Sequence, residues 1–187
     1  MFLIVGLGNI GKAYEDTPHN AGFKFVERFF DFYKFNSAVN VVNWQIKSSL
    51  DSEIAEIWIG NERKFLLAKP LTLMNRSGLA VSKLCKNFNI NIQRDLILAH
   101  DDLDIKLGAY KIQRGKFPKG HKGIISVHAM LPTKDFLHVR IGVDNRAALG
   151  FDIDGDKYVL RKFNKDELTV LDEVIESAVS DLNKLIA

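Results

Sequence analysis

Residues 2–11 have the sequence Phe-Leu-Ile-Val-Gly-Leu-Gly-Asn-Ile-Gly, and residues 2–8 form an apolar run that ends in glycines. Such a run is typical of a buried β-strand. Apolar side chains then recur at helical spacing across residues 25–33, which predicts a helix after a long loop. Strand and helix patterns continue to alternate along the chain. This alternation predicts an α/β fold in which helices flank a mixed, largely parallel, twisted sheet.

The remaining elements are predicted from the same two patterns. Apolar spacing predicts a second helix around residues 81–88 and a last helix after Asn164, where Asn164 and Glu167 form a capping box. The further predicted strands are 41–48 and 53–59, which form a hairpin, and 64–68, 96–99, 109–112 and 136–143.

Length and composition indicate one folded domain spanning residues 1–187. With 47% hydrophobic and 26% charged residues, the chain can bury a full core and does not have the composition of a disordered protein. The single cysteine, Cys85, excludes an intrachain disulfide and a cysteine-rich zinc site, and its place on the apolar face of the second helix predicts core packing. We expect a cytoplasmic protein with no targeting segment and no membrane contact, since residues 2–11 are too short to span a bilayer.

Charge is distributed unevenly along the chain. Residues 105–134 contain seven basic side chains and no acidic one, whereas residues 151–187 contain nine acidic and five basic side chains. A basic segment of this kind is either a binding face for a polyanion or ordinary solvated surface. Charge alone leaves both interpretations open.

The glycines of residues 6–11 match the pattern G-x-G-x-x-G of dinucleotide-binding proteins. That pattern must open a helix, but Pro18 disfavours helix at the residue before it, so helical spacing resumes only after Asn20. The acidic residue expected at the tip of a second strand would be Glu27 or Asp31, and both fall in the first predicted helix. A nicotinamide or flavin site is therefore the least favoured interpretation, and we expect no cofactor.

Polar residues follow several of the predicted strands. Asn9 follows the first strand, Asn75 follows strand 64–68, and His100 and Asp101 follow strand 96–99, while His19 can fold back over the same edge. Ligands of open α/β sheets bind at this edge. A histidine can take a proton from water, an adjacent carboxylate can orient it, and an amide can donate to a developing oxyanion. The group suits hydrolysis of an acyl bond; alternatively Asn75 caps a helix, Asp101 lies in a turn and His19 is a surface residue.

The acidic cluster at residues 100–104 raises the question of a metal site. Consecutive carboxylates cannot all face one ion without a special loop, and no calcium-binding glycine pattern is present. We expect a solvated turn with one functional aspartate and no metal. His128 and His138 are predicted to be structural.

The same residues carry a resemblance to the bacterial-type peptidyl-tRNA hydrolase family. The resemblance covers nearly the whole chain in the family's motif order. The matching segments are residues 5–9 with Tyr14, then 17–22, 73–78, 99–104, 120–123, 139–142 and 158–160.

This resemblance implies hydrolysis of the ester between a peptide and the 3′ ribose of tRNA, with water as the nucleophile and no cofactor. By motif position, His19 is expected to be the general base and Asp101 its orienting partner. Asn9 and Asn75 are expected to hold the substrate carbonyl and the peptide backbone.

The resemblance also implies how the substrate is bound. Tyr14, Leu73 and Met74 are expected to line the site of the 3′ end and the peptide, with His121 at the rim. Lys111 and Arg140 match basic positions that hold tRNA phosphate. The expected partner is peptidyl-tRNA, bound by a monomer that needs no protein partner.

Five positions depart from the family pattern, namely Ile10, Pro18, Leu73, Gln113 and Lys122. Lys122 stands where the family usually has asparagine, and Leu73 stands where an aromatic residue is usual. These changes leave an alternative open, namely a non-catalytic RNA-binding relative similar to chloroplast splicing factors. The joint presence of His19, Asp101 and both amides favours the enzyme.

Overall fold

The computed structural model describes residues 1–35, 38–150 and 152–186. Within these ranges, no helix is long and apolar enough to cross a membrane. The strands are β1 (Phe2–Gly6), β2 (Val39–Lys47), β3 (Ser52–Ile59), β4 (Glu62–Pro70), β5 (Leu96–Lys106), β6 (Tyr110–Arg114) and β7 (Leu137–Asp144). The α-helices are α1 (Ala21–Lys34), α2 (Ser77–Asn87), α3 (Ile92–Asp95), α4 (Lys122–Met130), α5 (Gly155–Tyr158) and α6 (Lys165–Ile186). Short 3-10 helices are η1 (Pro18–Asn20), η2 (Ser48–Leu50), η3 (Met74–Arg76) and η4 (Arg146–Leu149).

The strands form one seven-stranded sheet with the order β2-β3-β4-β1-β5-β7-β6. The central pairs β4–β1, β1–β5 and β5–β7 are parallel. The pairs nearer the two edges, β2–β3, β3–β4 and β6–β7, are antiparallel. The prediction of a mixed sheet is confirmed, with the parallel pairs at its centre, and so is the predicted hairpin of β2 and β3.

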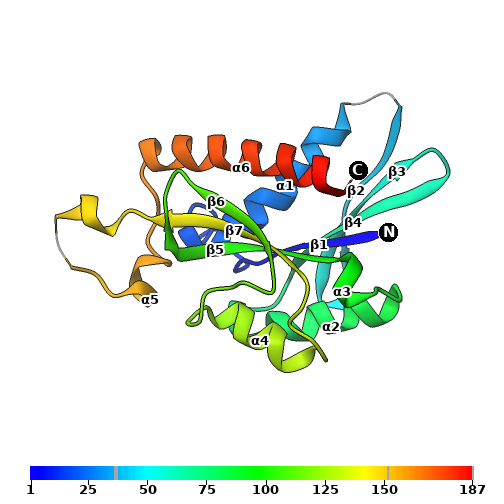
Figure 1. Cartoon of the computed structure of the whole chain (residues 1–187), viewed down its shortest axis with the longest axis horizontal. Helices are drawn as coiled ribbons and strands as arrows, with labels where there is room; N and C mark the ends of the chain where they lie inside the picture. The colour runs from blue at the N-terminus through cyan, green and yellow to red at the C-terminus, as the bar shows by residue number, and fades with distance from the viewer. Residues whose placement is uncertain (36–37, 151, 187) are drawn as a thin grey trace.

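Helices cover both faces of the sheet. The helices α1 and α6 lie on one face, and α2 and α4 lie on the other (Figure 1). Strand β1 serves both layers, because Ile4 belongs to the core under α1 and α6 while Leu3 and Val5 belong to the core under α2 and α4. This double burial explains why residues 2–8 are continuously apolar rather than alternating.

Gly6 and Gly22 allow close packing of α1 on the sheet. A Cβ atom on Gly6 would lie 2.1 Å from the carbonyl oxygen of Gly22, and a Cβ atom on Gly22 would lie 2.4 Å from the carbonyl oxygen of Ala99. Any larger residue at either position would push the first turn of α1 away from β1 and β5. These two glycines therefore bring η1, which immediately precedes α1, close to β5. The glycine pattern of residues 6–11 does not open a helix at residue 11.

Other local predictions are also confirmed. Asn164 and Glu167 form the capping box, since the Asn164 backbone N–H donates to Glu167 Oε2 and the Glu167 N–H donates to Asn164 Oδ1. Cys85 is buried in the core beneath α2.

Strand β5 corrects two predictions. It extends to Lys106, not to residue 99, because β7 continues the ladder by pairing with Asp102 and Lys106. Residues 100–104 are therefore part of a strand, and the prediction of a solvated turn is wrong: Asp101 and Asp102 are buried. His100 and Asp101 lie within β5, just after Ala99, which is the last residue of β5 that pairs with β1. Strand β5 therefore extends past the end of β1 and forms a step at this edge of the sheet.

Candidate active site

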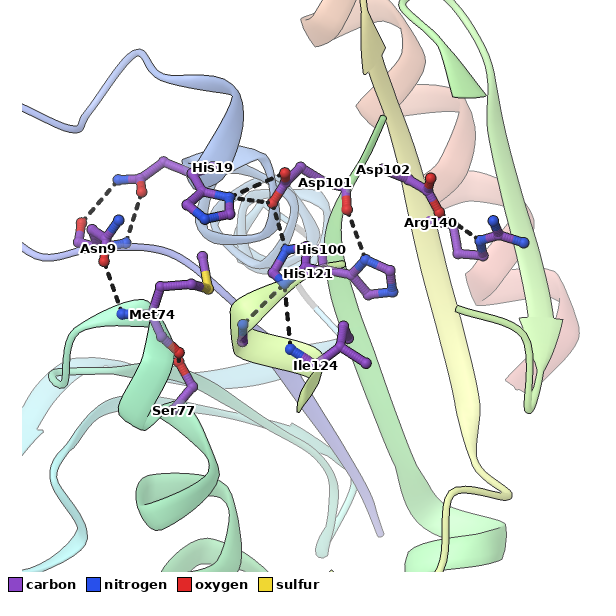
Figure 2. Close-up of polar contacts among 12 residues, drawn as sticks. Asn9, His19, Met74, Ser77, His100, Asp101, Asp102, His121, Ile124 and Arg140 are labelled. Carbon is purple, nitrogen blue, oxygen red and sulfur yellow. Dashed lines mark hydrogen bonds and ion pairs between the residues drawn. The ribbon is translucent and has the colours of Figure 1, made fainter. Parts of the chain in front are cut away.

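His19 and Asp101 meet at this step of the sheet. Pro18 occupies the first position of η1, where its fixed φ starts a helical turn, and the His19 backbone N–H donates to the carbonyl of Val159. The His19 Nδ1 atom lies 3.0 and 3.1 Å from the two carboxylate oxygens of Asp101 (Figure 2). With Nδ1 bound to the carboxylate, Nε2 is the ring nitrogen left for a substrate.

A second histidine binds the same carboxylate. His121 caps α4, with its Nδ1 accepting the N–H groups of Gly123 and Ile124 at 3.1 and 3.3 Å. Since Nδ1 supplies a lone pair to both donors, the ring proton must reside on Nε2, which lies 2.7 Å from Asp101 Oδ1. The helix cap thus fixes His121 in the tautomer that donates to Asp101.

These hydrogen bonds shift the pKa values of Asp101 and His19. Burial by itself raises the pKa of Asp101, but the two histidines outweigh it and lower the pKa of the carboxyl group well below its usual range. Burial lowers the pKa of His19, but the charge and hydrogen bond of Asp101 raise it more, so the net pKa lies above its usual value of 6.5. Lys122 lowers and Asp156 raises the pKa of His19 by smaller amounts.

Asn9 is held with its amide nitrogen free. Its Oδ1 accepts the Met74 backbone N–H at 2.8 Å, which links the loop after β1 to η3. The Asn20 side chain bonds the backbone of Asn9 twice, accepting from its N–H and donating to its carbonyl. Among the described residues the Asn9 NH₂ group has no partner, so it is available as a donor to a ligand.

A cleft of about 730 Å³ opens beside these residues, lined by His19, Asp101 and His121 and by loop residues before α4 and around α5. Lys122 and Asp156 form an exposed ion pair of 2.7 Å that joins α4 to α5 at this cleft. Sequence patterns gave no sign of this pair, because Asp156 lies in a segment without a motif.

Asp102 and Arg140 form a separate buried pair. Arg140 Nε donates to Asp102 Oδ2 at 2.7 Å, and Nη1 donates to Gln113 at 2.9 Å. The Arg140 side chain is only 12% exposed, so its charge is largely engaged inside the protein. Its strand neighbour Lys111 on β6 is exposed.

The other predicted site residues lie at different depths. His121 is buried against Asp101, which corrects its expected place at the rim. Met74 is buried, with Leu73 exposed beside it and Tyr14 half-buried in the loop before η1. Asn75 is exposed and lines a neighbouring groove rather than the cleft of His19.

Two further histidines, His100 and His138, connect to the site from within the sheet. His100 Nδ1 donates to the Asp101 carbonyl at 2.9 Å, and its Nε2 accepts from His138 Nδ1 at 3.2 Å. Burial lowers the pKa of His100 well below its usual value and lowers the pKa of His138 to about 3. The sequence indicated a structural role for His138, but not its contact with His100, which depends on the pairing of β5 with β7.

His19, Asp101 and His121 could also hold a metal ion, since one ligand atom from each lies within 4.8 Å of the others. The same three atoms are joined by hydrogen bonds in this structure. Hydrogen bonds thus account for the contacts among these three side chains.

The fold and the site together define an α/β protein with a buried His–Asp pair at the carboxyl side of the parallel centre of its sheet, an arrangement typical of general-base catalysis. A sequence model of the family described as peptidyl-tRNA hydrolase matches residues 3–187. The peptidyl-tRNA hydrolases of Mycoplasma capricolum and Ligilactobacillus salivarius are each 38% identical over 183 residues, which is 98% of this chain and 91% of theirs. The crystal structure of peptidyl-tRNA hydrolase from Acinetobacter baumannii superposes with a TM-score of 0.81 at 30% identity, over 100% of this chain and 88% of that one. The chain belongs to the peptidyl-tRNA hydrolase family.

Proposed function

We propose that this protein hydrolyses the ester bond between a peptide, or an N-blocked aminoacyl group, and the 3′ ribose of tRNA. The observation that carries the proposal is the His19–Asp101 pair, in which Nδ1 is bound by the carboxylate and Nε2 is left for a water molecule. A raised pKa makes the imidazole a stronger base than free histidine. Membership of the hydrolase family supports the same reaction.

The reaction follows from these positions. His19 Nε2 takes a proton from water as the water oxygen attacks the ester carbonyl carbon, and Asp101 stabilises the imidazolium that forms. The Asn9 NH₂ donates to the oxyanion of the tetrahedral intermediate. When the bond to the ribose oxygen breaks, His19 returns its proton to that oxygen, which releases free tRNA and a peptide carboxylic acid. The acid then loses the remaining proton of the water molecule to solvent.

The remaining predicted site residues are assigned to substrate binding. Asn75, Tyr14, Leu73 and Met74 surround the peptide and the 3′ end, and His121 acts on Asp101 rather than on the substrate. Exposed Lys111 holds tRNA phosphate, together with the guanidinium of Arg140 beside it on β7, although Asp102 neutralises the Arg140 charge. We place this activity in the cytoplasm and in a monomer.

Release of the acyl group from N-acetyl-aminoacyl-tRNA tests the proposal. We expect multiple turnovers by pure protein, little release from the unblocked aminoacyl-tRNA, and no loss of rate in excess chelator. Binding of tRNA without release of the acyl group would instead favour the non-catalytic RNA-binding relative. Retention of His19, Asp101, Asn9 and Asn75 as a set argues against that alternative.

A further inference from the structure

A second cavity lies beside the cleft of His19. This groove has a volume of about 400 Å³ and runs between α2 and α4. The two helices approach closely there, since a Cβ atom on Gly78 would lie 2.1 Å from the carbonyl oxygen of Ser126, and Ser126 Oγ accepts the Gly78 N–H at 3.0 Å. The groove is therefore a fixed feature of the helix packing.

The walls of the groove expose apolar side chains that the fold does not use. Helix α4 buries Ile124 and Val127 in the core, yet Ile125 is 54% and Met130 is 44% exposed. Together with Lys122 and Ala129, these two residues recur at helical spacing and give α4 a second, outward-facing stripe along the groove. Exposed apolar surface of this kind is typical of a binding site.

The groove is continuous with the proposed active site. Lys122, the first residue of α4, lines both the cleft of His19 and the groove. Asn75 lines the groove next to Met74, whose N–H binds Asn9. A chain whose carbonyl carbon sits at His19 and Asn9 can thus pass Asn75 and Lys122 directly into the groove.

We infer that the groove between α2 and α4 binds the substrate peptide upstream of the esterified residue and favours apolar side chains there. This inference rests on the proposed function and names the substrate class of that site. Apolar walls with polar groups at Asn75, Arg76 and Lys122 suit a peptide, whose backbone needs polar partners and whose side chains need contact area.

The tRNA does not suit the groove. A phosphate backbone requires clustered cations, but of the two cations at the groove, Arg76 and Lys122, Lys122 is paired with Asp156. Exposed Lys111 lies on β6, the outermost strand beyond β7. Helix α2 packs instead on β4, which is on the other side of β1 in the sheet. The peptide and the tRNA of the substrate therefore leave the cleft in different directions.

Three substrates on the same tRNA test the inference: N-acetyl-leucyl-tRNA, and two N-acetylated tetrapeptidyl-tRNAs that end in leucine and carry three valines or three serines upstream. Wild-type protein is expected to have a lower KM for the valine substrate than for the serine substrate. The double variant Ile125→Gln, Met130→Gln removes apolar surface without changing charge. It should raise the KM for the valine substrate about tenfold and leave its kcat unchanged.

The control variant is Leu185→Gln, which replaces an exposed apolar residue on α6. It should leave all three substrates unaffected, and the double variant should hydrolyse N-acetyl-leucyl-tRNA at the wild-type rate. Equal KM values for the valine and serine substrates in both proteins would overturn the inference while leaving the proposed function intact. A KM effect of the double variant on the short substrate would place tRNA in the groove and also overturn it, whereas no hydrolysis of any substrate by the wild type would remove the proposed function itself.

Discussion

Asp101 accepts hydrogen bonds from two histidines that reach it from different elements, His19 from η1 and His121 from the start of α4. The two donors share one carboxylate, so each affects the other through its charge. His121 also caps α4, which couples the position of that helix to the ionisation of the site. A substitution at residue 121 can separate these two roles.

His121→Asn is the substitution that does so. Asparagine is a good helix cap, so α4 should be retained, but its side chain cannot replace the Nε2–H donor to Asp101. The carboxylate then has more negative charge to stabilise imidazolium, and the pKa of His19 should rise further above 6.5. Because the base must be neutral, the acid limb of the kcat/KM profile should move to higher pH; an unchanged limb would show that His121 does not act through Asp101.

Lys122 and Asp156 offer a matched pair of charge changes near His19. Lys122 lowers and Asp156 raises the pKa of His19, so Lys122→Asn should move the acid limb to higher pH and Asp156→Asn should move it to lower pH. The rate on the neutral plateau should be maintained or raised in Lys122→Asn, since the pair is exposed and orients no group of the proposed mechanism. A large loss of plateau rate would mean that the lysine has a role of its own in the reaction.

For individual residues, the sequence predicted which side chains form the site better than it predicted their contacts. The meeting of His19 with Asp101 was predicted from strand ends and motif order, and it is confirmed. The burial of His121 and the ion pair of Lys122 with Asp156 were not predicted, because both depend on where α4 and α5 lie on the sheet. The engagement of Arg140 by Asp102 depends likewise on the register of β5 against β7.

At the scale of elements, β5 and β7 carry buried histidines between the sheet and α4. The five histidines of the chain form one connected series, with neighbouring ring centroids 5.0 to 6.1 Å apart from His19 through His121, His100 and His138 to His128. The His138 ring also stacks on Phe136 at 4.7 Å. An aromatic stack and a neutral hydrogen bond both favour the uncharged ring.

Stability should therefore fall in mild acid. Folded His138 has a pKa of about 3, below its usual value of 6.5, so between these pH values the unfolded chain binds more protons and stability drops as pH falls. From pH 7 to pH 5 this one group should reduce the free energy of unfolding by about 2 kcal/mol.

The variant His138→Asn keeps a donor for His100 but cannot titrate. Urea unfolding of both proteins at pH 7 and pH 5 measures the effect, and the variant should lose about 2 kcal/mol less than the wild type between the two pH values. The raised pKa of His19 acts in the opposite direction but is present in both proteins. Equal losses would mean that His138 is protonated in the folded state.

The elements themselves were largely predictable, but their ends were not. The last helix was defined by its own capping box, a local signal that tertiary contacts reinforce. Strand β5 was predicted too short because His-Asp-Asp interrupts the apolar run, although pairing with β7 extends it. A polar segment can be a strand when a neighbouring strand and buried partners satisfy it.

At the scale of the whole molecule, the basic side chains that precede α4 in the segment of residues 105–134 should bind tRNA mainly by releasing counterions. The logarithm of the association constant for deacylated tRNA is expected to fall linearly with the logarithm of the salt concentration. Lys111→Gln should reduce the steepness of this slope by about 1. Lys184→Gln, which changes an exposed lysine of α6, is the matched control and should leave the slope unchanged. A salt-independent affinity would contradict the assignment of a tRNA-binding face.

Turnover by His19→Ala tests the central claim most directly. The release of the acyl group from N-acetyl-aminoacyl-tRNA should be followed for wild type and variant under saturating substrate, together with tRNA affinity and thermal unfolding. Removal of the general base should lower kcat by roughly 10²- to 10⁴-fold, while tRNA affinity and folding stay close to wild type. A variant that folds, binds tRNA and still turns over at the wild-type rate would contradict the account.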